Sequence, residues 1–144
     1  MGARKRNRAE ERKEGMKTIY SAALRNCPSS PRKMRLVADL IRGIDVNKAL
    51  DILRYNAKDG SRDMEKLVMS AVSNWQVKNE NVRLEDSKLV VKEVFVNQAR
   101  TLKRIQPAPQ GRAYRIRKRS NHVTVILGNL NEAAETEVVK EKEA

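Results

Sequence analysis

The sequence has few of the residues that build catalytic or metal centres. Its 144 residues include a single Cys, Cys27, and a single His, His122. One cysteine excludes an internal disulfide and fits a reducing compartment, and the usual ligand set of a zinc site is missing. No Gly-rich phosphate loop and no paired-carboxylate motif occurs. We therefore expect no catalytic residue, no cofactor and no metal.

Aromatic side chains and long apolar runs are also scarce. Aromatic residues make up 3% of the chain, with Trp75 and Phe95 as the only Trp and Phe. This scarcity argues against a base-stacking surface of the kind that single-strand-binding proteins use. No apolar run approaches the roughly 20 residues that span a bilayer, and residues 1–15 lack the apolar core of a secretory signal. We expect a cytoplasmic protein that does not bind membranes.

The positive charge is concentrated in two parts of the chain. The formal net charge is +13, of which residues 1–42 carry +8 and residues 97–130 another +8, while residues 43–96 are neutral and residues 131–144 carry −3. A charge this far from zero is informative about partners rather than about fold. Nucleic acid is the leading candidate, because the release of condensed counterions favours each contact with a phosphate.

Residues 97–122 contain eight Lys or Arg and no acid. Their few apolar side chains cannot offset about 1–2 kcal/mol per residue of backbone ordering. The segment is either a solvated surface or an element that becomes ordered against a polyanion. We favour the polyanion, because soluble surfaces usually intersperse both signs of charge. Six of the eight cations are Arg, whose planar fork holds phosphate bidentately.

Three helices are predicted from capping residues and apolar periodicity. Ser30 and Pro31 are typical of a helix start, and Gly43 would end that helix. Asp45 can cap a second helix over residues 46–55, and Ser61 or Asp63 opens a third that ends near residue 79. The apolar positions with helical spacing, which we expect in the core, are Met34, Val37, Ala38, Ile41, Val46, Ala49, Leu50, Leu53, Met64, Leu67, Val68, Ala71, Val72 and Trp75.

Two strands are predicted around the basic segment. Residues 89–96 and 123–127 are rich in β-branched side chains and are natural partners, and residues 17–25 are compatible with a short extended segment. The interval between the partners far exceeds a hairpin loop of about 2–5 residues, and residues 107–111 supply a turn near its middle. We therefore expect a protruding β-hairpin arm over about residues 97–120. Strand alternation would place Arg115, Arg117 and Arg119 on one face and Arg112, Tyr114, Ile116 and Lys118 on the other.

The predicted fold is α+β: a small body of three helices packed on an antiparallel sheet, with a long protruding β-hairpin arm. Residues 1–15 are predicted to be a disordered basic tail, residues 16–129 a single domain, and residues 130–144 an acidic C-terminal tail.

The first turn of the first predicted helix carries Arg32, Lys33 and Arg35. Cations there oppose the helix dipole, at a cost of about 0.3–1 kcal/mol each. A phosphate bound near that end would make these cations favourable, because it pairs with them and the free backbone N–H groups also favour anions. The alternative is an indifferent, solvated helix start.

Two motifs in order carry a resemblance to a known family. The stretch KRIQPAPQGRAYRIRKRSNHVTVIL resembles the signature of the L twenty-two family of large-subunit ribosomal proteins, and SPRKMRLVADLIRG followed by VNKALDIL resembles that family's first two helices. The resemblance covers about residues 17–128. The chain departs from the family at the tip, which reads Ala-Pro-Gln at 108–110 where relatives more often place basic residues. The two tails extend beyond the common core.

The resemblance implies a structural constituent of the large ribosomal subunit that supports its assembly. Its partners would be large-subunit (23S-type) ribosomal RNA, neighbouring ribosomal proteins and the nascent polypeptide, with no DNA, because the family's hairpin lines the exit tunnel. By position, Lys103 and Arg104 match the family's outgoing strand, and Gly111 and Arg112 match its tip. The residues that match the family's return strand are Arg115, Lys118 and Arg119.

The residues that we expect to bind RNA are Arg32, Lys33, Arg35, Arg100, Lys103, Arg104, Arg112, Arg115, Arg117, Lys118, Arg119 and His122. The residues that we expect at the tunnel-lining tip are Gln106, Pro107, Ala108, Pro109, Gln110, Gly111 and Arg112.

Two rival functions have sequence requirements of their own. A basic DNA-binding regulator needs a recognition helix with exposed polar side chains that read bases, and the second and third predicted helices are too apolar or too charge-balanced for that. An RNA-processing enzyme would need His122 or a carboxylate as its acid or base. We expect His122 to be structural or to face RNA.

Overall fold

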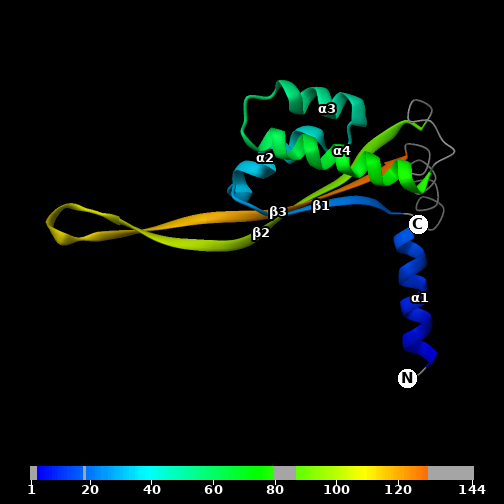
Figure 1. Ribbon diagram of the computed structural model, residues 1–144, viewed down its shortest axis with the longest axis horizontal. Helices are drawn as coiled ribbons and strands as arrows, with labels where there is room; N and C mark the ends of the chain where they lie inside the picture. Colours follow the sequence, from blue (N-terminus) through cyan, green and yellow to red (C-terminus); the bar gives the residue numbers. More distant parts are fainter. Residues whose placement is uncertain (1–2, 18, 80–86, 130–144) are drawn as a thin grey trace, which may run out of the picture.

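The computed structural model describes residues 3–17, 19–79 and 87–129 (Figure 1). In chain order its elements are α1 (Ala3–Lys17), β1 (Tyr20–Cys27), α2 (Pro31–Ile41), α3 (Val46–Tyr55), α4 (Gly60–Lys78), β2 (Leu89–Pro107), the 3-10 turn η1 (Pro109–Gly111) and β3 (Ala113–Asn129). The predicted acidic tail, residues 130–144, lies outside the described residues. The three helices predicted from capping and periodicity are confirmed as α2, α3 and α4, but α4 begins at Gly60 with Asp59 as its N-cap, before the predicted start at Ser61 or Asp63.

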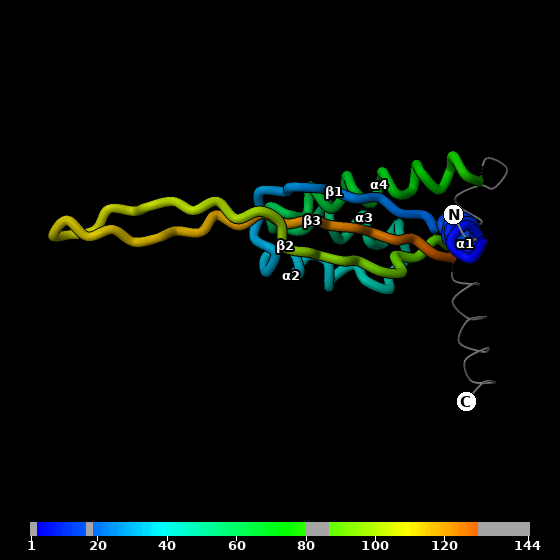
Figure 2. The backbone as a smooth tube through the Cα atoms, turned by 90° about the horizontal axis from the view of Figure 1, so that it is seen from below, coloured from blue at the N-terminus to red at the C-terminus, as the bar shows by residue number. Residues whose placement is uncertain are grey.

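The strands form an antiparallel sheet in the order β1-β3-β2. The predicted pairing of β2 with β3 is confirmed, and β1 adds a third strand on the other side of β3. Helices α2, α3 and α4 lie on one face of this sheet, and no described helix lies across the opposite face of the body (Figures 1 and 2). The α+β prediction is therefore confirmed, with a hairpin arm that extends far beyond the body.

Local chemistry explains where the helices begin and end. The Asp45 side chain accepts a hydrogen bond from the Asn47 N–H at 2.9 Å and so caps α3 as predicted. At the start of α2 Pro31 occupies the first turn, while the Ser30 side chain makes no capping bond. Gly43 turns the chain away after α2 at φ +76°, which glycine adopts without steric cost. Its N–H then donates to the Val91 carbonyl at 2.9 Å.

The hydrophobic core lies between the helices and the sheet. The predicted core positions are all buried except Leu50 and Val72, which are partly buried and pack against the core. Trp75 is 2% exposed, and its ring meets that of Tyr20 edge to face at 6.3 Å between centroids. Alternate residues of β3, Val123, Val125 and Leu127, complete the core from the sheet side.

Residues 1–15 were predicted to be a disordered basic tail, whereas Ala3–Lys17 form helix α1. Their Ala, Arg, Lys and Glu are strong helix formers, and an Arg6–Glu10 ion pair at 3.5 Å adds an i,i+4 contact. The helix has no apolar face to bury, and the side chains of residues 3–16 are exposed. It projects from the end of the body opposite the arm (Figure 1). Propensity rather than packing therefore produces α1.

Candidate nucleic-acid interface

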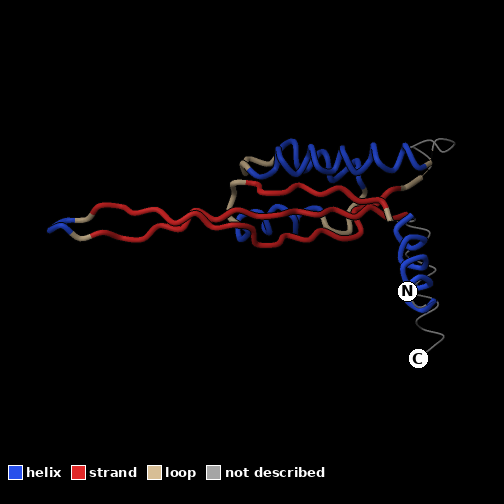
Figure 3. Tube along the Cα trace, turned by 60° about the horizontal axis from the view of Figure 1, so that its bottom comes forward, coloured by secondary structure: helices blue, strands red, loops and turns tan. Residues whose placement is uncertain are grey.

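The arm is a two-stranded ribbon that leaves the body and carries no core. Strands β2 and β3 pair continuously from Thr101 opposite Arg119 to Pro107 opposite Ala113, and they run out to the tip as two long strands (Figure 3). No residue between 97 and 119 is buried. The arm predicted from the charge run and the central turn is therefore confirmed.

The tip reverses the chain where the sequence placed a turn. The Ala108 N–H donates to the Arg112 carbonyl at 2.8 Å, and the Arg112 N–H donates to the Pro109 carbonyl at 3.4 Å. Between them Gln110 and Gly111 adopt φ values of 59° and 69°. Both values lie in the left-handed region of backbone conformation, which glycine adopts readily and glutamine rarely. The tip residues of the sequence prediction thus lie together at the far end of the arm.

The pairing register separates the arm's side chains onto two faces. Opposite residues of antiparallel strands share a face, and Arg115, Arg117 and Arg119 lie opposite Ile105, Lys103 and Thr101. The predicted Arg face is confirmed and gains Lys103. We define the cationic face as Lys103, Arg115, Arg117 and Arg119. The mixed face consists of Leu102, Arg104, Gln106, Tyr114, Ile116 and Lys118. Arg112 belongs to the tip turn, so strand alternation does not place it on either face.

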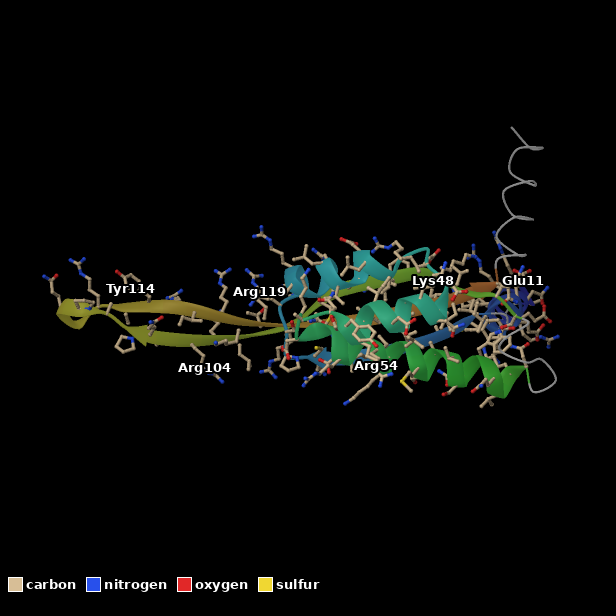
Figure 4. All side chains as sticks on the ribbon, turned by 90° about the horizontal axis from the view of Figure 1, so that it is seen from above. Glu11, Lys48, Arg54, Arg104, Tyr114 and Arg119 are labelled. Carbon is tan, nitrogen blue, oxygen red and sulfur yellow. The ribbon has the colours of Figure 1, made fainter. Side chains whose placement is uncertain are left out.

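The cations of the arm have no acidic partner within the described part of the chain. The ion pairs there are Arg6–Glu10 and Arg42–Asp39, both outside the arm. Arg119 projects from the ribbon (Figure 4), whereas Arg104 donates from Nη1 to the neighbouring Lys103 carbonyl at 3.0 Å. The Arg119 guanidinium and the remaining N–H groups of Arg104 are therefore exposed without an acidic partner in the described residues.

The first turn of α2 lies beside the base of the arm. The buried Asn121 side chain of β3 donates from Nδ2 to the Ser29 carbonyl at 2.7 Å, which ties the start of α2 to β3. Arg32 and Lys33 are exposed there. Arg35 donates from Nη2 to the Val96 carbonyl at 3.2 Å, so it also fastens α2 to β2. The structure thus brings together the two basic regions that are far apart in sequence.

Two β-bulges lie at the junction of body and arm. The β2–β3 register shifts between Gln98 and Thr101, and the β1–β3 register shifts between Leu24 and Cys27. Bulges bend a strand and increase its twist, so they redirect the chain where the core ends.

Asn121, which ties α2 to β3, is a residue that sequence reasoning missed. The available signal was a polar residue at an inward position of an alternating pattern.

His122 has a structural contact at this junction. Its Nδ1 accepts a hydrogen bond from the Asn26 N–H at 3.0 Å, which places the proton of the neutral ring on Nε2. Asn26 itself adopts φ 57° in the bulge. The imidazole is thereby held with its Nε2–H as the remaining donor.

Cys27 is not a reactive thiol. Its side chain is buried, and its Sγ donates to Asp63 Oδ2 at 3.4 Å. Burial is the main cause that raises the pKa of the Cys27 thiol, which favours the neutral form. In residues 3–17, 19–79 and 87–129 no three His, Cys, Asp or Glu side chains gather into a possible metal site. Over the same residues, no helix combines the length and apolarity that crossing a bilayer requires.

Comparison with known proteins agrees with this geometry. Residues 22–128 match the model of the family described as "Ribosomal protein L22p/L17e". The protein named "Large ribosomal subunit protein uL22" from Flavobacterium psychrophilum is 57% identical over 131 residues, which cover 91% of this chain and 96% of that relative. The proteins of the same name from Flavobacterium johnsoniae and Porphyromonas gingivalis are each 59% identical over 131 residues, 91% of this chain and 96% and 97% of the relatives.

Proposed function

The chain belongs to the ribosomal protein L22p/L17e family, and from that premise we propose that its arm is held by ribosomal RNA and reaches the nascent-polypeptide tunnel. The protein is a structural, non-enzymatic component of the large ribosomal subunit. Its partners are ribosomal RNA and neighbouring ribosomal proteins. The rest of the proposal concerns which residues make these contacts and what they achieve.

One observation carries the proposal: the arm has eight cations, no acid and no buried residue. A two-stranded ribbon alone is marginally stable in water. Phosphates around the arm would remove the repulsion among its cations and release counterions. We assign this role to all the arm cations predicted from the sequence: Arg100, Lys103, Arg104, Arg112, Arg115, Arg117, Lys118 and Arg119.

A second contact is assigned to the first turn of α2. Arg32 and Lys33 are exposed beside free backbone N–H groups, and Arg35 lies in the same turn. Because Asn121 fixes this turn against the base of the arm, one RNA segment at α2 and others along the arm would be held at a set spacing. Assembly of the subunit would gain from this bridging.

The tip is proposed to face the nascent polypeptide. Between Gln106 and Gly111 it carries no charge, and Arg112 is its single cation. The hydrogen-bonded turn from Ala108 to Arg112 presents uncharged side chains at the far end of a cationic ribbon. A growing chain would therefore meet a weakly charged surface there.

Replacement of three cations on the cationic face tests the RNA assignment. Arg115, Arg117 and Arg119 are changed to Ser, and the control changes the exposed body lysines Lys48, Lys58 and Lys66 to Ser. Binding to protein-free large-subunit RNA is measured at several salt concentrations. We expect the slope of log affinity against log salt to fall by about 2–3 for the arm variant, from about 0.9 per lost phosphate contact. The control should change it much less.

Equal losses for the arm variant and the body variant would contradict the assignment, because binding would then follow net charge alone. A salt-independent affinity of the unaltered protein would exclude phosphate neutralisation as the mechanism.

Neither rival function is supported. The apolar stripes of α3 and α4 are part of the hydrophobic core, and the chain's family is ribosomal. The Nδ1 of His122 is occupied by the Asn26 N–H, and the family is structural rather than enzymatic.

A further inference from the structure

The face of the body sheet opposite the helices carries a group of side chains that do not belong to the core. On β3, Asn121, Val123 and Val125 are buried under the helices, so the alternate residues His122 and Thr124 lie on the other face. No described helix covers that face (Figure 2). Its residues are therefore available to a partner.

An aromatic ring stands on this face close to the base of the arm. Phe95 lies opposite Thr124, and Thr124 lies opposite Ala23 on β1, so these residues form one row across the three strands. Phe95 is 47% exposed although it belongs to a body strand. Its row neighbours are small and leave the ring accessible. A sheet stabilised only by burial would place its one Phe on the helix side.

Hydrogen-bonding groups occupy the next row toward the arm. Asn97 lies opposite His122, and the β1 bulge of Arg25 and Asn26 lies on the other side of His122. The bond from the Asn26 N–H to Nδ1 leaves the Nε2–H of His122 as a donor of fixed orientation. Asn97 adds amide donors and an acceptor, and Arg25 adds an exposed guanidinium. An aromatic ring, base-edge hydrogen-bonding groups and a cation thus occupy adjacent rows.

We propose that this open-face patch (Ala23, Arg25, Phe95, Asn97, His122 and Thr124) binds an unpaired nucleotide of ribosomal RNA. The base stacks on Phe95, its edge bonds to His122 and Asn97, and Arg25 contacts a neighbouring phosphate. The proposal rests on the proposed function, since it adds a site to the same RNA interface. It also reverses the sequence-based argument against stacking, because one accessible ring suffices for one base.

The surroundings favour RNA over a protein as the occupant. The patch contains no acid and continues into the cationic arm, where Arg100 and Arg119 lie just beyond Asn97 and His122 along the strands. Glu93 lies one row farther from the arm, opposite Ile126. The charge on the arm side of Phe95 is therefore positive and complementary to phosphate.

The test compares Phe95→Ala with Phe95→Trp, which keeps an aromatic ring, and with Tyr55→Ala as a control. Tyr55 is 86% exposed on α3, on the helix side of the body. Binding to protein-free large-subunit RNA is measured over a range of salt, and thermal unfolding confirms that each variant is folded. Loss of one stacked base is expected to weaken binding roughly tenfold without changing the salt slope. Phe95→Trp and Tyr55→Ala should bind like the unaltered protein.

Unchanged affinity of folded Phe95→Ala would overturn the proposal. Normal binding to free RNA combined with defective incorporation into subunits would also overturn it, because a protein would then occupy the patch. Equal weakening by Phe95→Trp would exclude stacking. Failure of the proposed function would give a different result. The RNA affinity of the unaltered protein would then not depend on salt.

Discussion

Strands β2 and β3 run through two environments, and the comparison separates what pairing supplies from what packing supplies. In the body, Val91, Val94 and Val96 of β2 and alternate residues of β3 are buried. In the arm the same two strands remain paired, yet no side chain is buried. Backbone hydrogen bonds give both regions the same local geometry. A core stabilises the body, and under the proposed function the arm depends on RNA.

The body and the arm also differ in how the outer edge of β2 is covered. In the body the outer edge of β2 is covered, because Arg35 and Arg42 donate to the Val96 and Val94 carbonyls, each at 3.2 Å. The backbone of Ile44 also accepts from the Val91 N–H at 3.0 Å. In the arm, the described residues show one side-chain bond to a backbone carbonyl, the local one from Arg104 to Lys103 at 3.0 Å. The like charges of the arm disfavour pairing with another arm, so the ribbon stays available to RNA.

The largest contrast in stability is expected from matched isoleucines. Ile41 is fully buried in α2, whereas Ile105 in the arm is 73% exposed. Ile41→Ala should lower the free energy of unfolding by about 2–5 kcal/mol, because it leaves a cavity. Ile105→Ala should change it by less than about 0.5 kcal/mol. Urea unfolding followed by the fluorescence of Trp75 measures both.

A loss at Ile105 comparable to that at Ile41 would break the comparison, because the arm would then contribute to the cooperative core of the free protein.

A smaller effect is expected at the junction. Asn121→Ala removes the bond to the Ser29 carbonyl and should cost about 1–3 kcal/mol of unfolding free energy, since a partly buried acceptor loses its partner. Asn97→Ala, an exposed position on the neighbouring strand, serves as the control and should be nearly neutral. The same urea titration applies. Equal stability of the two variants would mean that Asn121 does not tie α2 to the arm.

The sequence predicts the body and the arm well because both produce strong patterns. Helical periodicity marks the core helices, and the absence of acids marks the arm. The position of β1 beside β3 was not predictable, because YSAALRNC has neither strict alternation nor β-branched residues. Helix α1 was not predicted, because its residues have helix propensity but no apolar periodicity. Phe95 lies on the open face because the β2–β3 register shifts between Val91 and Glu93, and that bulge leaves no clear sequence signal. Asn121 did have a signal, since it is a polar residue at an inward position of an alternating pattern.

Amide hydrogen exchange of the arm tests the central claim most directly. The amides of residues 101–107 and 113–119 are compared with those of residues 89–96 and 123–127, in the free protein and in the large ribosomal subunit. We expect fast exchange of the arm and slow exchange of the body strands in the free protein, and slow exchange of both in the subunit. Strong protection of the arm in the free protein would contradict the account.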